Sequence, residues 1–248
     1  MGDAVSAIYE DREGLIWVGV YGLGLSKFDP NTEQFVHYRH DPENTLSLSN
    51  NVVSAIYEDR NGSLWIGTEN GLNKYDGHTF TRYQHDPNNP QSIISNWILT
   101  IYEDRSGEFW LGTGNGLDRF SPLEGKFTHY QHVSTDPQSL GDNTVTSIYE
   151  DQTGTFWVGT TGGLDRFDCR NDQFTHYTTK DGLSSDAVYG ILEDEQGRLW
   201  LSTANGISRF DPRTERTRSQ PGAQLKRAGR KSGSHRPSGS SSGNGKAC

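Results

Sequence analysis

The chain has 248 residues, of which 31% are hydrophobic, 11% are aromatic and 29 are glycine. This composition excludes a large helical core and a disordered chain, and it favours many short strands joined by tight turns. Residues 1–211 carry 14 basic and 31 acidic side chains, whereas residues 212–248 carry nine basic and one acidic. An acidic body is therefore followed by a basic tail.

Several protein classes are excluded at this level. The two cysteines, Cys169 and Cys248, form neither a disulfide framework nor a metal-binding motif. No apolar run approaches the roughly 18 residues of a membrane span. The first residues lack the basic and apolar regions of a secretory signal, so the sequence alone leaves the location open.

One sequence motif recurs five times along the chain, and the spacing of its copies indicates the fold. The tryptophans that mark the register are separated by 48, 45, 47 and 43 residues, a period typical of propeller blades or helical arrays. We expect these side chains to pack between neighbouring repeats rather than to form a ligand cage. The five tryptophans are Trp17, Trp65, Trp110, Trp157 and Trp200.

The second repeat distinguishes between the two alternatives. Apolar and polar residues alternate over 53–58, the turn Asp-Arg-Asn-Gly follows over 59–62, and Leu-Trp-Ile-Gly-Thr predicts a second strand over 64–68. Further strands are predicted over 72–75 and 80–83. Four antiparallel strands per repeat make one propeller blade, so the sequence predicts an all-β propeller with five repeats.

The predicted blades cover about 3–48, 49–94, 95–141, 142–184 and 185–212. The first four end in Phe-x-x-Tyr, but the fifth gives Arg216 to Ser219 instead, so we expect its fourth strand to be lost and the propeller to be open or incomplete. Residues 213–248 are predicted to be a disordered Ser/Gly-rich tail. The change in composition near Arg216 also fits a shifted reading frame, which sequencing the source DNA across codons 210–220 would test.

The repeats resemble the two-component regulator propeller repeat. The pattern stands in the third copy as Asp104-x-x-Gly107-x-Phe109-Trp110-Leu111-Gly112-Thr113, followed by Gly116 to Phe120. Departures are Val20 for Thr in the first copy and Ser202 for Gly in the fifth.

That resemblance implies the extracytoplasmic sensor half of a hybrid two-component system, acting in signal transduction by phosphorelay. Such propellers are typically seven-bladed, often occur as tandem pairs, and commonly respond to glycan fragments. A membrane helix and a histidine kinase usually follow. We find no phospho-acceptor helix and no nucleotide-binding box in this chain, which we therefore expect to be non-enzymatic and a fragment of a larger sensor.

Ligands of propellers usually bind where the loops before strand one and between strands two and three converge, because variable loops on a fixed scaffold carry function. Trp97 breaks the repeat there, since the other copies have small or β-branched residues at its position. It could stack on a sugar, or it could pack against a neighbouring loop. Tyr21 is the second aromatic candidate.

Polar residues in the same two loop sets are further ligand candidates, although such residues more often satisfy the backbone of turns. Before strand one these are Asn51, Asn96, Asn143 and Asp186, with Asp3 in the first copy. Between strands two and three they are Glu69, Asn70, Asn115 and Asn205.

No metal, cofactor or catalytic residue is predicted. The turn aspartates lack the spacing of calcium ligands, so we interpret them as turn-forming residues. The histidines lie in fourth strands and loop starts of different blades, which argues against a shared metal site and against the alternative of a propeller hydrolase or lyase.

The partners that we expect are an oligosaccharide or another small ligand and, in a larger protein, a further propeller and a kinase module. A protein-interaction scaffold is the remaining alternative. The open blade edges also allow a homo-oligomer. Nucleic acid is not expected, because the body is acidic and the basic tail has no aromatic residues; its basic residues include Lys226, Arg227, Arg230, Lys231 and Arg236.

Overall fold

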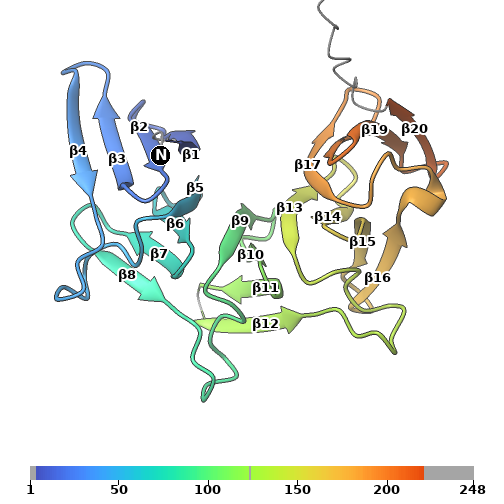
Figure 1. Cartoon of the computed structure of the whole chain (residues 1–248), viewed down its shortest axis with the longest axis horizontal. Coiled ribbons are helices and arrows are strands. Elements are labelled where there is room, and N and C mark those ends of the chain that lie inside the picture. Colours follow the sequence, from blue (N-terminus) through green and yellow to red (C-terminus); the bar gives the residue numbers. More distant parts are fainter. Residues whose placement is uncertain (1–3, 123, 221–248) are drawn as a thin grey trace, which may run out of the picture.

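The fold is an open arc of five four-stranded antiparallel sheets in the computed structural model, which describes residues 4–122 and 124–220 (Figure 1). In every sheet the strands are hydrogen-bonded in chain order, so each repeat is one blade. The predicted all-β propeller of four-stranded blades is confirmed.

The first strand of each blade lies on the inner side of the arc and the fourth on its outer side (Figure 1). One short 3-10 helix, η1 (Thr179–Asp181), precedes the last blade. The strands are β1 Val5–Glu10, β2 Ile16–Val20, β3 Gly24–Asp29 and β4 Gln34–Tyr38 in blade 1; β5 Val53–Glu58, β6 Leu64–Thr68, β7 Gly71–Tyr75 and β8 Phe80–Tyr83 in blade 2; β9 Ile98–Glu103, β10 Phe109–Thr113, β11 Gly116–Ser121 and β12 Lys126–Tyr130 in blade 3; β13 Val145–Glu150, β14 Phe156–Thr160, β15 Leu164–Asp168 and β16 Gln173–Tyr177 in blade 4; β17 Val188–Glu193, β18 Leu199–Thr203, β19 Gly206–Asp211 and β20 Arg216–Gln220 in blade 5.

The turn between the first two strands of each blade is built around one aspartate. In blade 2, Asp59 Oδ1 accepts hydrogen bonds from the backbone N–H groups of Asn61 and Ser63, at 2.9 and 2.8 Å. Its Oδ2 accepts a third from Trp65 Nε1 at 2.9 Å. The same Asp–Trp bond recurs in all five blades at 2.7–2.9 Å, which confirms the turn-forming interpretation of these aspartates.

Neighbouring blades pack through two different faces. We call the face with the strand-two tryptophan the Trp face, which in blade 2 carries Tyr57, Trp65 and Tyr83, and the opposite face the Phe face, which in blade 3 carries Phe109 and Phe120. The Trp65 ring lies 4.8 Å from Phe109 and 5.9 Å from Phe120, measured between centroids. Aromatic pairs at these distances stabilise a core beyond the burial of their area.

The tryptophans of blades 1 to 4 are buried in such contacts, and the prediction that they pack between blades is confirmed for these four. The glycine that follows in strand two leaves room for the next blade. A β-carbon on Gly112 would lie 2.8 Å from Val145 Cγ1 on β13, so a larger side chain would separate blades 3 and 4.

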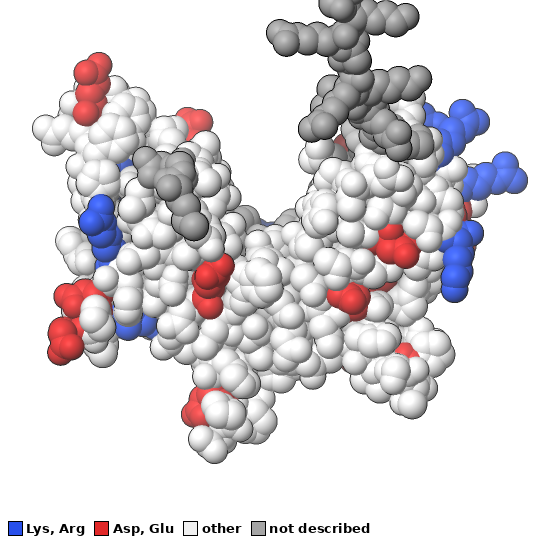
Figure 2. Space-filling model, in the orientation of Figure 1, with Lys and Arg blue, Asp and Glu red and all other residues white. Residues whose placement is uncertain are grey.

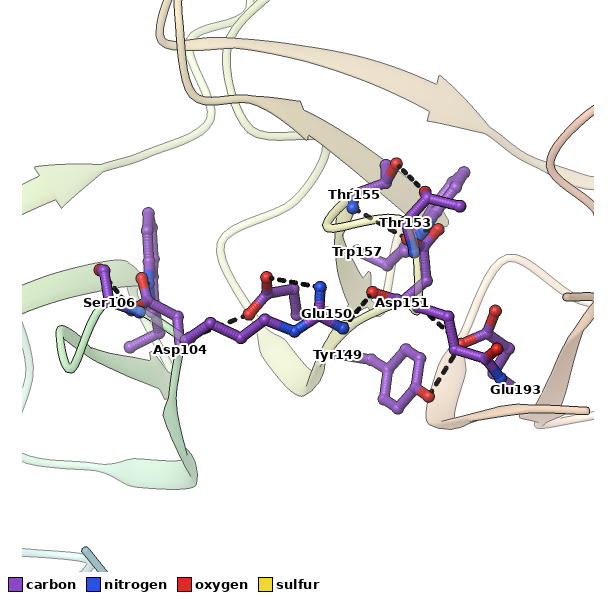
Figure 3. A network of polar contacts seen from close by, with 12 residues as sticks. Asp104, Ser106, Tyr149, Glu150, Asp151, Thr153, Thr155, Trp157 and Glu193 are labelled. Carbon is purple, nitrogen blue, oxygen red and sulfur yellow. Dashed lines mark hydrogen bonds and ion pairs between the residues drawn. The ribbon is translucent and has the colours of Figure 1, made fainter. Parts of the chain in front are cut away.

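Hydrogen bonds and ion pairs between the first turn of one blade and the next blade also join neighbouring blades, and we call each such set of contacts a bracket (Figure 3). The backbone N–H of Arg105 in blade 3 donates to Glu150 Oε2 at 3.1 Å, and its Nη2 donates to the Asp151 carbonyl oxygen at 2.7 Å. In blade 4 the same turn position is Gln152, whose N–H donates to Glu193 Oε2 at 2.9 Å (Figure 3). The glutamate that ends strand one therefore caps the turn of the preceding blade.

The last blade needs a correction. The sequence predicts that its fourth strand is lost and that the blade ends near 212, yet β20 pairs with β19 in a regular register from Asp211↔Arg216 to Ile207↔Gln220. A ladder needs only backbone groups, so the strand forms without the usual aromatics. The blade is incomplete in its side chains, because Thr217 and Gln220 stand where earlier blades have Phe and Tyr.

Residues 221–248, which contain most of the predicted basic tail, lie outside the described residues. Within 4–122 and 124–220 there is no helix long and apolar enough to cross a membrane.

Candidate functional site

Five pairs of positions, which we call the rim, lie at one end of the blades. In each blade the first residue of the turn between strands two and three donates its backbone N–H to the carbonyl oxygen of the residue before strand one, at 2.9–3.1 Å. This bond repeats while the side chains change, so the rim is a variable surface on a fixed backbone. The pairs are Tyr21 with Ala4, Glu69 with Val52, Gly114 with Trp97, Thr161 with Thr144, and Ala204 with Ala187.

Trp97 is one of the two exposed aromatic residues on the rim, with 48% of its surface accessible. A β-carbon on Gly114 would lie 2.5 Å from Trp97 Cε3, so the indole ring lies directly over this glycine. The Trp97 backbone is held from both sides, by Gly114 N–H at 3.0 Å and by Ser95 Oγ at 3.2 Å. One face of the ring is therefore covered by the neighbouring turn and the rest is presented to solvent.

The other predicted aromatic and acidic candidates occupy equivalent turn positions in other blades. Tyr21 is exposed in blade 1 and Glu69 is exposed in blade 2, both at the position that Gly114 holds in blade 3. Blade 2 lies between Tyr21 and Trp97, so these two rings belong to different sectors of the rim.

The polar residues before strand one brace their own loops. Asn51 Oδ1 accepts a hydrogen bond from the backbone N–H of His40 at 2.8 Å, and Asn96 does so from His85 at 2.7 Å. Asn143 and Asp186 make the same bond to the backbone N–H groups of His132 and Thr179, each at 2.7 Å. These contacts favour the turn interpretation of the set over a ring of ligand groups. Asp3 lies outside the described residues.

The asparagines between strands two and three are also held by local bonds. Asn70, Asn115 and Asn205 each donate a backbone N–H to the threonine hydroxyl that ends strand two, at 3.1–3.2 Å. Asn205 Nδ2 also donates to the Ser184 carbonyl oxygen at 3.2 Å. These residues shape the turns on which the rim side chains stand.

A pair that the sequence analysis did not predict fixes the loop of Trp97. His129 Nδ1 lies 2.6 Å from Asp118 Oδ1, and His129 Nε2 lies 2.9 Å from the carbonyl oxygen of Pro90. Asp118, which is completely buried, also accepts the backbone N–H of Ile94 at 2.8 Å. Residues 84–97, which lead from β8 to β9, are thus tied at two points to the blade that they enter.

Blade 4 repeats this anchor, with His176 between Asp165 and the carbonyl oxygen of Pro137 at 2.8 and 3.0 Å. The hydrogen bonds to Asp118 and Asp165 raise the pKa values of His129 and His176 above their ordinary value. An aspartate in strand three with a histidine 11 residues later in strand four is the sequence signal that could have identified both pairs.

Two cavities between neighbouring blades lie away from the rim. One of about 300 Å³ lies between blades 1 and 2 beside Trp17 and Tyr75, and one of about 500 Å³ lies between blades 3 and 4 beside Tyr130 and Asp172. Trp97 lines neither, so the rim is an open surface. Within the described ranges, no three His, Cys, Asp or Glu side chains come together as a metal site requires.

The sequence matches a family model for the two component regulator propeller at residues 1–22, 47–70, 92–115, 139–162 and 182–205. Each match covers the first two strands of one blade and reaches the rim turn. None of the curated proteins matches the sequence.

The extracellular domain of a hybrid two component system from B. thetaiotaomicron is similar in structure, with a TM-score of 0.77 and 26% identity over 88% of this chain and 30% of that one. Virginiamycin B lyase from Staphylococcus aureus has a TM-score of 0.66 and 15% identity over 90% of this chain and 71% of its own. PorZ of the Porphyromonas gingivalis type-IX secretion system has a TM-score of 0.64 and 19% identity over 82% and 31%.

The likeness to the lyase and to PorZ concerns the fold alone, and the chain spans 30% of the extracellular domain that it resembles. The repeat match, in contrast, recurs in the same place on all five blades. This chain therefore belongs to the two component regulator propeller family.

Proposed function

We propose that this arc is a sensing module of a two-component signalling protein, and that it binds its signal at the rim around Trp97 without catalysing a reaction. The observation that carries the proposal is the Trp97 ring, which is exposed, oriented by Gly114 and fixed through the anchored loop. A ring held in one orientation loses little entropy when a ligand stacks on it. The likeness to an extracellular domain supports a location outside the cytoplasm as part of this proposal.

Oligosaccharide fragments are the ligand class that we propose, because a flat and partly apolar ring suits the face of a pyranose. The neighbouring rim positions are small or polar, as at Thr144 and Thr161 in blade 4, so hydroxyl groups could be contacted there. Signal would pass as a change in how the propeller packs on a partner module.

The histidines do not support the enzymatic alternative. His40, His85 and His132 each place Nδ1 at 2.8–2.9 Å from a carbonyl oxygen of their own loop, and His129 is held between Asp118 and Pro90. These rings hold loops in place, whereas a general base has to face a substrate. The fold shared with a lyase at 15% identity adds no catalytic residue.

Isothermal titration of the full chain with cello-, xylo- and maltohexaose tests the proposal. We expect one of these glycans to bind and Trp97→Ala to weaken its binding by about 10- to 100-fold, as for a stacking anchor. The control is Val133→Ala, which truncates an exposed apolar residue on an outer loop. Equal affinity of Trp97→Ala and the wild type would exclude this part of the rim as the site, and binding of no glycan by the wild type would exclude the ligand class.

A further inference from the structure

The two ends of the arc present surfaces that are buried at every internal junction. On the Trp face of blade 5, Leu192 is 72% exposed and Trp200 is 41% exposed, whereas Trp65 on the Trp face of blade 2 is 1% exposed. Together with Ile207, Leu192 and Trp200 line an apolar hollow of about 490 Å³. No part of the described chain covers this face.

Blade 1 presents the complementary surface. On its Phe face, Val5, Ile8 and Phe35 are exposed, and Ile8 reaches 69%. The equivalent side chains of blade 3, Ile98 and Ile101, are buried against the Trp face of blade 2. The arc therefore ends in a free Trp face on blade 5 and a free Phe face on blade 1, the two kinds of face that meet at each internal junction. Contiguous apolar patches of this kind mark interaction sites.

The outer part of the junction is complementary in charge. Between blades 4 and 5, Arg166 Nη1 lies 3.1 Å from Glu215 Oε1, and Glu215 also accepts the hydroxyl of Tyr177 at 2.8 Å. Arg209 is the blade 5 equivalent of Arg166, and Glu33 is the blade 1 equivalent of Glu215. Figure 2 shows basic side chains along the outer side of the arc at the blade 5 end.

The backbone supports this correspondence. Glu33 and Glu215 have φ values of 56° and 53°, a left-handed conformation that non-glycine residues seldom adopt, and both stand just before strand four. The two carboxylates are therefore carried by the same turn geometry. If blade 1 of a second copy packs against blade 5, Glu33 of that copy comes close to Arg209. This pair would correspond to the ion pair between Arg166 and Glu215.

One contact of the junction is mismatched. In blades 1 to 3 the first turn carries an arginine that reaches the next blade, as Arg105 reaches Glu150 and Asp151 (Figure 3). Blade 5 has Glu195 at this position, and the strand-one glutamate that it would meet on blade 1 is Glu10. Two like charges there weaken a contact between the ends without removing its apolar part.

We propose that a second copy of this chain docks the Phe face of its blade 1 on the Trp face of blade 5, burying there the kinds of side chain that the four junctions inside the arc bury. The contact joins two different surfaces, so each added copy leaves a new face available. Blades 1 and 5 face each other across the open side of the arc (Figure 1), so the second copy has to tilt out of the plane of the first. We therefore expect open-ended growth.

Two variants of the full chain, each blocked at one end, test the docking. Leu192→Glu places a charge on the exposed blade 5 face, and Ile8→Glu does so on blade 1. Light scattering after size exclusion, at 5–200 µM as a working range suited to micromolar association, is expected to show growth of the wild type and monomers of each variant. An equimolar mixture of the two variants is expected to give dimers, because each partner retains one complementary face.

Val133→Glu, which charges an exposed outer loop, is the control and should associate like the wild type. Circular dichroism melts show whether each variant is folded. A wild type that stays monomeric over this range overturns the proposal. So does association of either single variant alone, because that would mean like faces pairing, and so does a mixture of folded variants that stays monomeric.

A substitution that strengthens association tests the register independently. Glu195→Arg restores the turn arginine of blades 1 to 3 and removes the repulsion from Glu10, so the association constant should rise about tenfold. Gln196→Arg is the control, because it adds a positive charge one position away from the bracket. An equal increase with both variants, or none with Glu195→Arg, would contradict the proposed register.

Discussion

Replacing the two His–Asp anchors by Arg–Asn pairs, whose charge does not change between pH 6 and pH 9, should remove a pH dependence of stability. His129 Nδ1 faces a carboxylate and His129 Nε2 faces a carbonyl oxygen, and both of these oxygens only accept hydrogen bonds. The ring therefore carries both protons when the anchor is formed. In blade 2 the same place is held by Asn73 and Arg82, whose guanidinium bonds to the carbonyl oxygen of Ser47 at 2.8 Å.

The sign follows from the raised pKa of His129. Because its folded pKa lies above its unfolded value, the stabilisation is complete below the unfolded pKa of about 6.5 and is lost as pH rises through the folded pKa. His129 and His176 are about one quarter exposed, so we reduce the usual 1.5–3 kcal/mol of a charge-assisted bond to about 1 kcal/mol each. Both anchors together give about 2 kcal/mol, or about 4–8 °C in melting temperature.

The assay compares melting temperatures between pH 6 and pH 9 for the wild type and for a variant that copies blade 2 at both sites. This variant is Asp118→Asn, His129→Arg, Asp165→Asn, His176→Arg. We expect the wild type to lose the 4–8 °C as pH rises and the variant to lose much less. An equal loss in both proteins would refute the reasoning, because the pH dependence would then arise from other groups.

Three further predictions concern the blades themselves. Asp151→Ala removes the turn bonds and the bond to Trp157, and should lower the free energy of unfolding by about 3 kcal/mol in urea titrations. Gly112→Ala brings a methyl group against Val145 and should lower it by about 1–3 kcal/mol; a neutral result would mean that blades 3 and 4 pack loosely. Gln152→Arg supplies the turn arginine that blade 4 lacks and should raise the melting temperature, whereas no change would show that the bracket adds nothing beyond its backbone bond.

The sequence by itself determined the blade. Strand alternation, the turn chemistry of Asp59 and the position of Trp65 act over a few residues, so they can be read from one repeat and checked against four others. The family follows from the same local pattern, because each match covers the first two strands of a blade. The identification of Trp97 as a break in the repeat also needed only the comparison of copies.

The tertiary structure decided what depends on neighbours that are distant in sequence. The orientation of Trp97 is set by Gly114 across a turn, and His129 meets Pro90 because a loop crosses from the preceding blade. The strand β20 forms because the edge of β19 offers backbone partners to a segment with little strand preference of its own. Trp200 holds the same position in its repeat as Trp65 and is nevertheless exposed, since burial of a blade face is decided by the blade that stands next to it.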